Sequence, residues 1–341
     1  MDFAKFLARR KLVTKGLVKF NDRPEGFGAW RSSFQNTVRD LNLSHTFSNN
    51  SEKHPFLFLI FCLLYLTGVL WNLLMIIVIS RNHNLHTPMY VFLAHLSFVD
   101  ICYPSVTLPK LMDILLSGDN SISFVQCFTQ MFFFIFMGCT EIALLSSMAY
   151  DRYVAICQPL HYHFIMNRKR CLLLLGITWI SGCGNALFLL TLASKLLFCR
   201  SNKIYQLFCD VKAFLSISCS NNSFQVMILI ETLLYALCPF LLSLSSYVQI
   251  INIILHIKST NGRKKAFSTC TSHLMVLILY YATILCMYMR PPAEQSALLD
   301  HVSSVLFSTV TPMLNPLIYS LRNKDVKIAL VRLLRIKNKK Y

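Results

Sequence analysis

Charged residues within long apolar runs are the residues of this chain best placed to do chemistry. Asp151 and Arg152 are adjacent at the end of one apolar run, Glu141 stands inside the same run, and Asp100 stands inside the run before it. Burying a charge in an apolar setting is costly unless it is paired, so such residues are usually retained for a function. An adjacent acid and base at the edge of a membrane segment indicates a switch.

The sequence lacks the motifs of several other membrane functions. It contains no HExxH zinc motif and no GxSxG nucleophile elbow. The stretch 298–320 has no lysine that could hold retinal as a Schiff base. Symmetry-related broken helices, which are typical of transporters, are also missing. We therefore expect neither an enzyme, nor a light-driven pump, nor a transporter.

The composition indicates one membrane-embedded bundle. The 341 residues are 55% hydrophobic and only 14% charged, and the mean hydropathy is +0.52. No ordinary soluble domain has this composition. The net charge of +18 would suggest nucleic-acid binding in a soluble protein, but the basic residues cluster in short segments between apolar runs. This pattern favours the cytoplasmic loops of a membrane protein and excludes a nucleic-acid partner.

Seven apolar stretches are long enough to cross a lipid bilayer as helices. Lipid cannot satisfy free backbone polar groups, so helices are the expected spanning elements. The fold class predicted here is an all-α membrane protein, a seven-transmembrane helix bundle with a short cytoplasmic amphipathic helix. The predicted spans are 55–80, 89–113, 127–157, 171–193, 224–254, 266–289 and 298–320.

Basic residues set the expected orientation. They concentrate after spans one, three, five and seven, which places the N-terminus outside and the C-terminus in the cytoplasm of a multi-pass plasma-membrane protein. We expect an extracellular segment 1–54, a membrane domain 55–320 and a cytoplasmic tail 321–341. The tail spaces its apolar residues as a helix lying on the inner membrane surface would, and a frayed basic tail is the alternative. That apolar stripe is Val326, Ala329, Leu330, Leu333 and Leu334.

Four of the thirteen cysteines have positions suited to disulfides. Cys127 opens span three, and Cys199, Cys209 and Cys219 lie in the long outside loop between spans four and five. An oxidising compartment allows disulfides there, and four cysteines permit three pairings. Cys127 with Cys209 would tie the loop to span three, and Cys199 with Cys219 would close a loop within it. A zinc site is the rival interpretation, although the loop offers no histidine.

The segment before span one combines two glycosylation patterns with an atypical beginning. Asn42 and Asn49 each start an Asn-x-Ser triplet on the predicted outer side. Residues 1–40 are polar and basic, and they lack the apolar core of a signal peptide. They faintly resemble coding fragments of retroelement polyproteins, so we interpret them as a fused or mispredicted exon. A basic amphipathic helix over 3–20, similar to a transit peptide, is the alternative.

Five motifs together resemble those of the vertebrate odorant (olfactory) receptors, a branch of the rhodopsin-like (class A) G-protein-coupled receptors. They are HTPMYVFLAHLSFVDICY at 86–103, MAYDRYVAICQPLHYH at 148–163, SYVQI at 246–250, KAFSTCTSHL at 265–274 and PMLNPLIYSLRN at 312–323. The resemblance covers roughly residues 42–335. Two motifs depart from the family pattern: Trp71 replaces the usual glycine before Asn72, and Tyr280-Tyr281-Ala282 replaces the usual Phe-Tyr-Gly.

The resemblance implies roles for the charge pair. Asp151-Arg152-Tyr153 resembles the family's activation triplet. On this hypothesis Asp151 holds Arg152 at rest, and the guanidinium is freed to meet the G protein when the bundle opens inward. The alternative is a pair of side chains that merely extend toward the membrane interface.

The resemblance also implies a hinge in span seven. Asn315-Pro316 begins a motif that ends at Tyr319, and Pro316 interrupts the helical hydrogen bonding. Tyr319 and Tyr247 lie near the inner ends of their spans, where we expect their hydroxyls to bridge in the active state. A simple kink without a switching role is the alternative.

Two acids within the spans predict a polar cluster. Asp100 and Glu141 would repel each other unless they share a proton or a cation, and Asn72 and Asn315 could complete the cluster. The resemblance implies an allosteric sodium site, whereas the alternative is one protonated acid bonded to its neighbours. We expect no other metal and no other cofactor.

The resemblance places a ligand pocket in the outer half of spans three, five and six. Glu231, an acid in span five, hints at an odorant with an amine or hydroxyl group, and the alternative is a protonated acid bonded within the bundle. A small volatile odorant and a stimulatory or olfactory heterotrimeric G protein that raises cAMP are the implied partners. A chemosensory or other class A receptor for a non-volatile ligand outside the olfactory epithelium is the alternative function. The pocket candidates are Phe134, Ile135, Gly138, Cys139, Met227, Ile228, Glu231, Tyr281 and Ile284.

Overall fold

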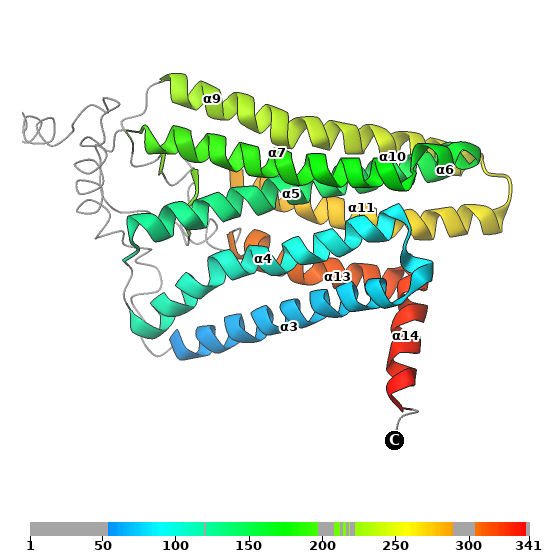
Figure 1. Ribbon diagram of the computed structural model, residues 1–341, viewed down its shortest axis with the longest axis horizontal. Helices are drawn as coiled ribbons and strands as arrows, with labels where there is room; N and C mark the ends of the chain where they lie inside the picture. The colour runs from blue at the N-terminus through cyan, green and yellow to red at the C-terminus, as the bar shows by residue number, and fades with distance from the viewer. Residues whose placement is uncertain are drawn as a thin grey trace, which may run out of the picture.

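The computed structural model is a bundle of long helices lying side by side (Figure 1). It describes residues 54–118, 121–196, 208–211, 214–215, 218, 222–288 and 304–338. The predicted segment 1–54, with Asn42 and Asn49, lies outside the described residues except for His54. The all-α membrane fold class is confirmed, because the described elements are helical and several could cross a membrane.

The helices match the predicted spans closely. Their bounds are α3 His54–Arg81, η2 His83–Leu85, α4 Pro88–Ser117, α5 Phe124–Cys157, η3 Pro159–His161, α6 Tyr162–Ile165, α7 Arg168–Ser194, α9 Asn222–Thr232, η4 Leu233–Leu237, α10 Cys238–His256, α11 Thr260–Tyr288, η6 Leu306–Val310, α13 Thr311–Arg322 and α14 Lys324–Asn338. Within the described part of the chain, five helices are long and apolar enough to cross a membrane. These are Pro55–Arg81, Pro88–Ser117, Val125–Cys157, Arg168–Ser194 and Val226–His256.

The sixth and seventh predicted spans have a different form. Cys270–Leu285, within α11, is a shorter apolar helix. The described part of the seventh span starts at Ser304, passes through the π-helical segment η6 and continues as α13, which contains Pro316. The fifth span is also composite, since the π-helical segment η4 separates α9 from α10. Such π segments alter the facing of the residues on either side of them.

Local sequence explains where several helices begin and end. Ser123 caps α5, because its hydroxyl accepts from the backbone N–H of Gln126 while the Gln126 side chain accepts from Ser123. Asn167 caps α7 in the same manner. Gly118 ends α4 with a φ of 70°, a left-handed conformation that favours glycine.

The helix α5 lies at the centre of the bundle and contacts α4, α7, α10 and α11. Its centrality explains why one helix carries most of the candidate site residues. By contrast, the fifth span turns much of its surface outward, and large apolar side chains such as Leu229 and Leu234 are exposed there. An apolar surface of this kind is stable in lipid rather than in water.

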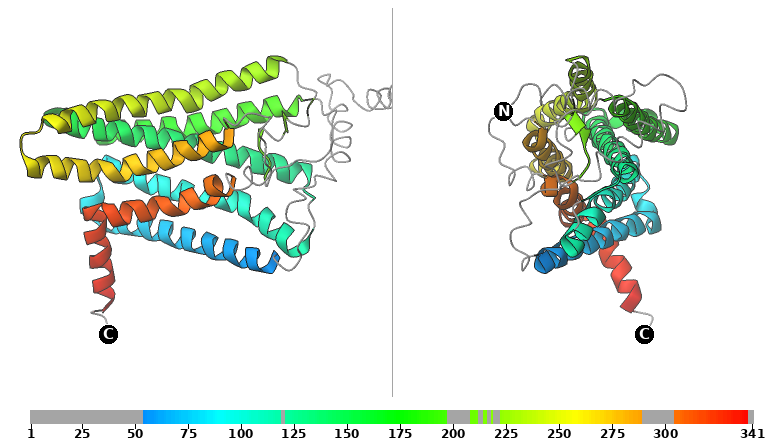
Figure 2. Two further views of the ribbon diagram at one scale, coloured as in Figure 1. Left: turned by 180° about the vertical axis from the view of Figure 1, so that it is seen from behind. Right: turned by 90° about the vertical axis from the view of Figure 1, so that its left-hand side faces the viewer.

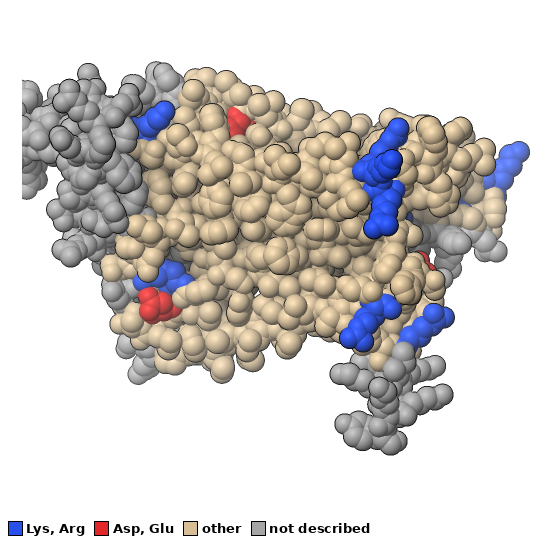
Figure 3. All heavy atoms as spheres, viewed as in Figure 1, with Lys and Arg blue, Asp and Glu red and all other residues tan. Residues whose placement is uncertain are grey.

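The helix α14 leaves one end of the bundle at a steep angle (Figures 1 and 2). Val326 and Ala329 are buried against the bundle, whereas Lys327 and Arg332 are exposed. Part of the apolar stripe predicted for the tail therefore packs against the helix bundle. Lys and Arg side chains gather at this same end of the molecule (Figure 3).

Candidate functional site

The adjacent charges near the C-terminal end of α5 form a closed ion pair. Arg152 Nη2 lies 2.6 Å from Asp151 Oδ2, and Arg152 Nε donates to the same oxygen over 3.1 Å. The other carboxylate oxygen accepts a 2.9 Å hydrogen bond from the hydroxyl of Tyr162, which belongs to α6. Asp151 is fully buried, so these three bonds replace the water that its charge has lost.

Tyr162 is well suited to hold Asp151 from the loop side. Burial raises the pKa of the Tyr162 phenol, and the neighbouring Asp151 carboxylate raises it further. The hydroxyl therefore keeps its proton and remains a donor at physiological pH. The partly buried neighbour Tyr153 completes the predicted triplet and packs near Tyr150, with ring centroids 6.4 Å apart.

A second polar group lies between α10, α11 and α13. The Tyr247 hydroxyl lies 2.7 Å from His273 Nδ1 and 3.4 Å from the Cys270 carbonyl oxygen. Tyr319 is fully buried, and its hydroxyl has no hydrogen-bond partner among the described residues. In this structure Tyr247 is therefore held by α11, and the predicted bridge between Tyr247 and Tyr319 is not formed.

The polar cluster in the middle of the bundle joins α4 to α13 through Asp100 and Asn315, which are 215 residues apart in the sequence. Asn315 Nδ2 donates to both carboxylate oxygens of Asp100 at 3.0 and 3.1 Å. Asp100 and Glu141 are both buried and are close enough for their charges to interact. Asn72 instead donates to the carbonyl oxygens of Gly68 and Pro312, so its amide joins α3 to α13 one turn before Asn315.

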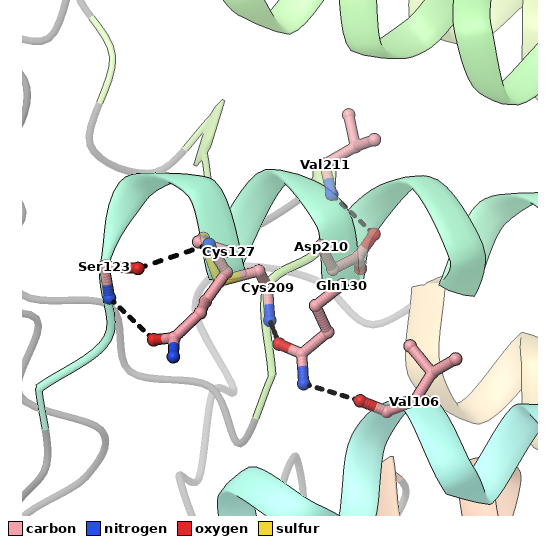
Figure 4. The surroundings of a disulfide bond; sticks show 8 residues. Val106, Ser123, Cys127, Gln130, Cys209, Asp210 and Val211 are labelled. Carbon is pink, nitrogen blue, oxygen red and sulfur yellow. Dashed lines mark hydrogen bonds between the residues drawn. A yellow bond between two sulfur atoms is a disulfide. The ribbon is translucent and has the colours of Figure 1, made fainter. Parts of the chain in front are cut away.

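A disulfide and a glutamine fix the outer loop to α5 (Figure 4). Cys127 is bonded to Cys209, 82 residues later, which selects one of the three pairings left open by the sequence. Gln130 Oε1 accepts from the Cys209 backbone N–H at 2.9 Å, and Gln130 Nε2 donates to the Val106 carbonyl oxygen at 3.0 Å. Cys199 and Cys219 lie outside the described residues.

The fixed loop places an aromatic ring against the predicted pocket. Phe208 packs on Phe134 with ring centroids 4.6 Å apart, and Phe134 also contacts Tyr103 and Phe307. Gly138, one turn further along α5, accepts a hydrogen bond from the Tyr280 hydroxyl through its carbonyl oxygen. Spans two, three, six and seven thus converge with the loop on an aromatic cluster.

The remaining pocket candidates divide into buried and outward-facing residues. Ile135 and Tyr281 are buried, Ile228 and Ile284 are half-buried, and Met227 is 45% exposed. Tyr281 packs against Phe240, with ring centroids 4.8 Å apart.

Glu231 meets an amide in the adjacent span. Asn185 Nδ2 donates to Glu231 Oε1 at 2.7 Å and lies 3.1 Å from Cys139 Sγ. Three spans therefore meet at one polar point: α5 through Cys139, α7 through Asn185 and α9 through Glu231. Of these, Cys139 and Glu231 were predicted as pocket residues, and the structure brings both to the same partner.

Comparison with known proteins identifies the family. A family model described as olfactory receptor matches residues 61–337. The chain belongs to the olfactory receptor family. Olfactory receptor 1E2 of Gorilla gorilla gorilla is 46% identical over 284 residues, which cover 83% of this chain and 90% of the relative. Olfactory receptor 1M1 of Mus musculus is 43% identical over 291 residues, which cover 85% and 93% of the two chains.

Membership in the olfactory receptor family confirms several predictions. The protein is a class A G-protein-coupled receptor and a multi-pass membrane protein, and it is not an enzyme. Odorant ligands and coupling to a G protein are the general function of olfactory receptors. The matched region excludes the first sixty residues, so the family model does not extend over the atypical beginning of the chain.

Several partner residues in this olfactory receptor were missed by sequence reasoning. Tyr162 and His273 lie inside two of the family motifs, so their positions were visible although no role was assigned to them. Gln130 follows Cys127 by three residues, which places it on the same helical face as the disulfide. Asn185 had one weak signal, a polar side chain in the apolar run of span four.

Proposed function

We propose that this protein is an odorant receptor that binds small volatile ligands in its outer half and activates a stimulatory or olfactory G protein, raising cAMP. The observation that carries the proposal is the closed Asp151–Arg152 ion pair at the inner end of α5. A buried guanidinium held by a single carboxylate has two discrete states, bound or released, and a bistable element is what a switch requires.

The arrangement of the bundle supports a route from ligand to G protein. The aromatic cluster around Phe134 lies on the same helix as Arg152, and Asp100, Glu141 and Asn315 lie between them. A change in packing at one end of α5 can therefore alter polar contacts along its length.

A second group of residues would report the active state. Release of Tyr247 from His273 would free its hydroxyl for Tyr319, and the hinge at Asn315-Pro316 would supply the necessary movement of α13.

We propose that the end of the bundle carrying α14 faces the cytoplasm. Exposed basic residues gather there, including Arg168, Lys169 and Arg170, and none of these three belongs to an ion pair between described residues. At the opposite end Lys110 is paired with Asp113 at 2.7 Å. This asymmetry follows the positive-inside bias. An epitope tag at the C-terminus should be detected only after the cells are permeabilised, and labelling of intact cells would refute the orientation.

We also propose that Asp100 and Glu141 share one small cation, either a proton or sodium. Glu141 Oε1 and Asn315 Oδ1 are buried oxygens without a hydrogen-bond partner among the described residues, and a cation would satisfy both. Replacing sodium by choline at constant ionic strength should raise agonist potency if sodium is bound and stabilises the resting state. Glu141→Gln should abolish that sodium effect. A potency that is independent of sodium but varies with pH would indicate the proton.

The direct test of the proposed function is a cAMP assay in cells that display the full chain. The expected result is a concentration-dependent response to at least one member of a volatile odorant panel. Arg152→Ala, at matched surface density, should not respond. A surface-displayed receptor that is silent to every volatile but active on a peptide would overturn the odorant assignment.

A further inference from the structure

We propose that Glu231 and Asn185 form a subsite that recognises the ammonium group of a protonated amine. The inference rests on the proposed odorant function and adds the chemical class of the ligand. It begins from a contrast within one helix: the acid at position 231 is drawn into the bundle while its neighbours face outward.

The surroundings of Glu231 show that its direction is specific. Leu229 is 58% exposed and Ile230 is 50% exposed, as expected for a helix that borders lipid. Glu231, the next residue, reaches the Asn185 amide at 2.7 Å, and Asn185 is itself buried in the adjacent span. A carboxyl group placed only for solubility would point toward an interface, whereas this one points toward spans three and four.

The backbone next to Glu231 also departs from a regular helix. The π-helical segment η4 begins at Leu233, two residues after the acid, and ends at Leu237, just before Pro239. One π turn rotates the side chains before it about the helix axis relative to the side chains after it. Such turns often occur at functional sites. The acid therefore lies directly beside an irregular turn of the fifth span.

The hydrogen bonding of Glu231 leaves room for a donor. Asn185 occupies Oε1, and within the described part of the chain no hydrogen bond reaches the second oxygen. The ion pairs between described residues are Lys110–Asp113 and Arg152–Asp151, so none of these residues neutralises Glu231 as Arg152 neutralises Asp151. Asp210, in the loop beside the disulfide, is close enough for its charge to interact with Glu231.

These features favour a cationic ligand over a neutral or anionic one. An alkylamine carries a positive charge at neutral pH, as lysine does. Its ammonium can donate to the second oxygen of Glu231 while the Asn185 amide keeps the first oxygen in place. An anionic odorant would be repelled by Glu231, and a neutral alcohol would gain only an uncharged donor contact.

The test uses the full chain in cells and odorants with one carbon skeleton and four end groups: primary amine, alcohol, aldehyde and carboxylic acid. The wild-type receptor should respond to the amine at the lowest concentration and should not respond to the acid. Glu231→Gln keeps the size of the side chain but removes its charge. It should raise the half-maximal amine concentration about tenfold or more, because a hydrogen bond to a charged group contributes about 1.5–3 kcal/mol.

A neighbouring variant supplies the control. Thr232→Ser retains the hydroxyl that bonds to the Ile228 carbonyl oxygen, and it should leave the amine response unchanged at equal surface density.

The possible negative results separate failure of the amine subsite from failure of the proposed odorant function. A wild-type receptor that prefers the alcohol, or a Glu231→Gln variant with unaltered amine potency, would overturn the amine subsite while leaving the odorant function intact. Silence toward all four end groups and the wider volatile panel, at normal surface density, would overturn the proposed function as well.

Discussion

The end of α5 that carries Arg152 and the region around Glu231 treat an acidic side chain in opposite ways. At the inner end Asp151 has a guanidinium on one oxygen and a phenol on the other. In the outer half Glu231 has one amide donor and no cation among the described residues. Both acids are costly to remove from water, but only the first is neutralised by the protein itself.

The presence or absence of a cationic side chain beside the acid indicates what each region can do. A neutralised acid can act as a latch, because opening the latch exposes a charge that another protein can bind. An acid held by an amide alone can act as a receptor site, because an incoming cation completes it. In the proposed function, the two regions correspond to the output and the input of the receptor.

Loss of Arg152 should have the largest effect. Arg152→Ala leaves the fully buried Asp151 carboxylate without its cation, and breaking such a pair costs about 3–5 kcal/mol. We expect no odorant-evoked cAMP and a lower melting temperature of the detergent-solubilised receptor. A variant that signals normally would show that the pair at the inner end is not the latch.

Loss of the two hydrogen bonds that Gln130 makes to Cys209 and Val106 should have the next largest effect. Gln130→Met keeps the side-chain length but removes both hydrogen bonds, leaving the Cys209 N–H and the Val106 carbonyl unpaired. We expect a loss of about 1–3 kcal/mol, seen as reduced surface density in flow cytometry. Gln130→Glu retains the acceptor for Cys209 and should recover part of that density. Equal surface densities for wild type and Gln130→Met would show that the Gln130 hydrogen bonds do not stabilise the receptor.

Loss of the Asn185 amide tests whether this amide orients Glu231. Asn185→Leu leaves Glu231 without its donor, with an expected cost of about 1 kcal/mol because the acid is only partly buried. Amine potency should fall, whereas cAMP in the absence of ligand should stay close to the wild-type level because the Asp151–Arg152 pair is unchanged. Improved amine potency would show that the amide competes with the ligand rather than orienting the acid.

Tyr162→Phe should have the smallest effect of the series. It removes one of the three hydrogen bonds to Asp151 but leaves the ion pair intact. We expect up to about 1 kcal/mol of lost stability for the resting state, measured as a modest rise in cAMP without ligand. Complete silence of this variant would show that Tyr162 serves the active state instead.

The spans were predictable from the sequence because their signal is local. Twenty or more apolar residues specify a crossing helix wherever it packs, and the predicted limits of the first five spans lie within a few residues of the observed helices. The contact between Asp100 and Asn315, 215 residues apart, was also predicted, because a carboxyl group inside a span needs polar partners and the family resemblance pointed to the same cluster.

Other contacts depend on the rotation of helices and could not be predicted. Asn72 was grouped with Asp100, but its amide bonds to Gly68 and Pro312 because α3 packs directly against α13. The partner of Glu231 depends on the facing of α9, which the π turn in η4 changes. The pairing of Cys127 with Cys209 required the path of the loop, since the sequence left three pairings open.

The central claim is that Asp151 holds Arg152 closed, and ligand-independent cAMP is its most direct measure. Asp151→Asn keeps the size of the side chain and its hydrogen-bonding capacity but removes the charge that retains the guanidinium. At matched surface density, we predict cAMP several-fold above wild type in the absence of odorant, and the rise should vanish when Arg152→Ala is added. A level of cAMP at or below wild type in the Asp151→Asn receptor would contradict the account.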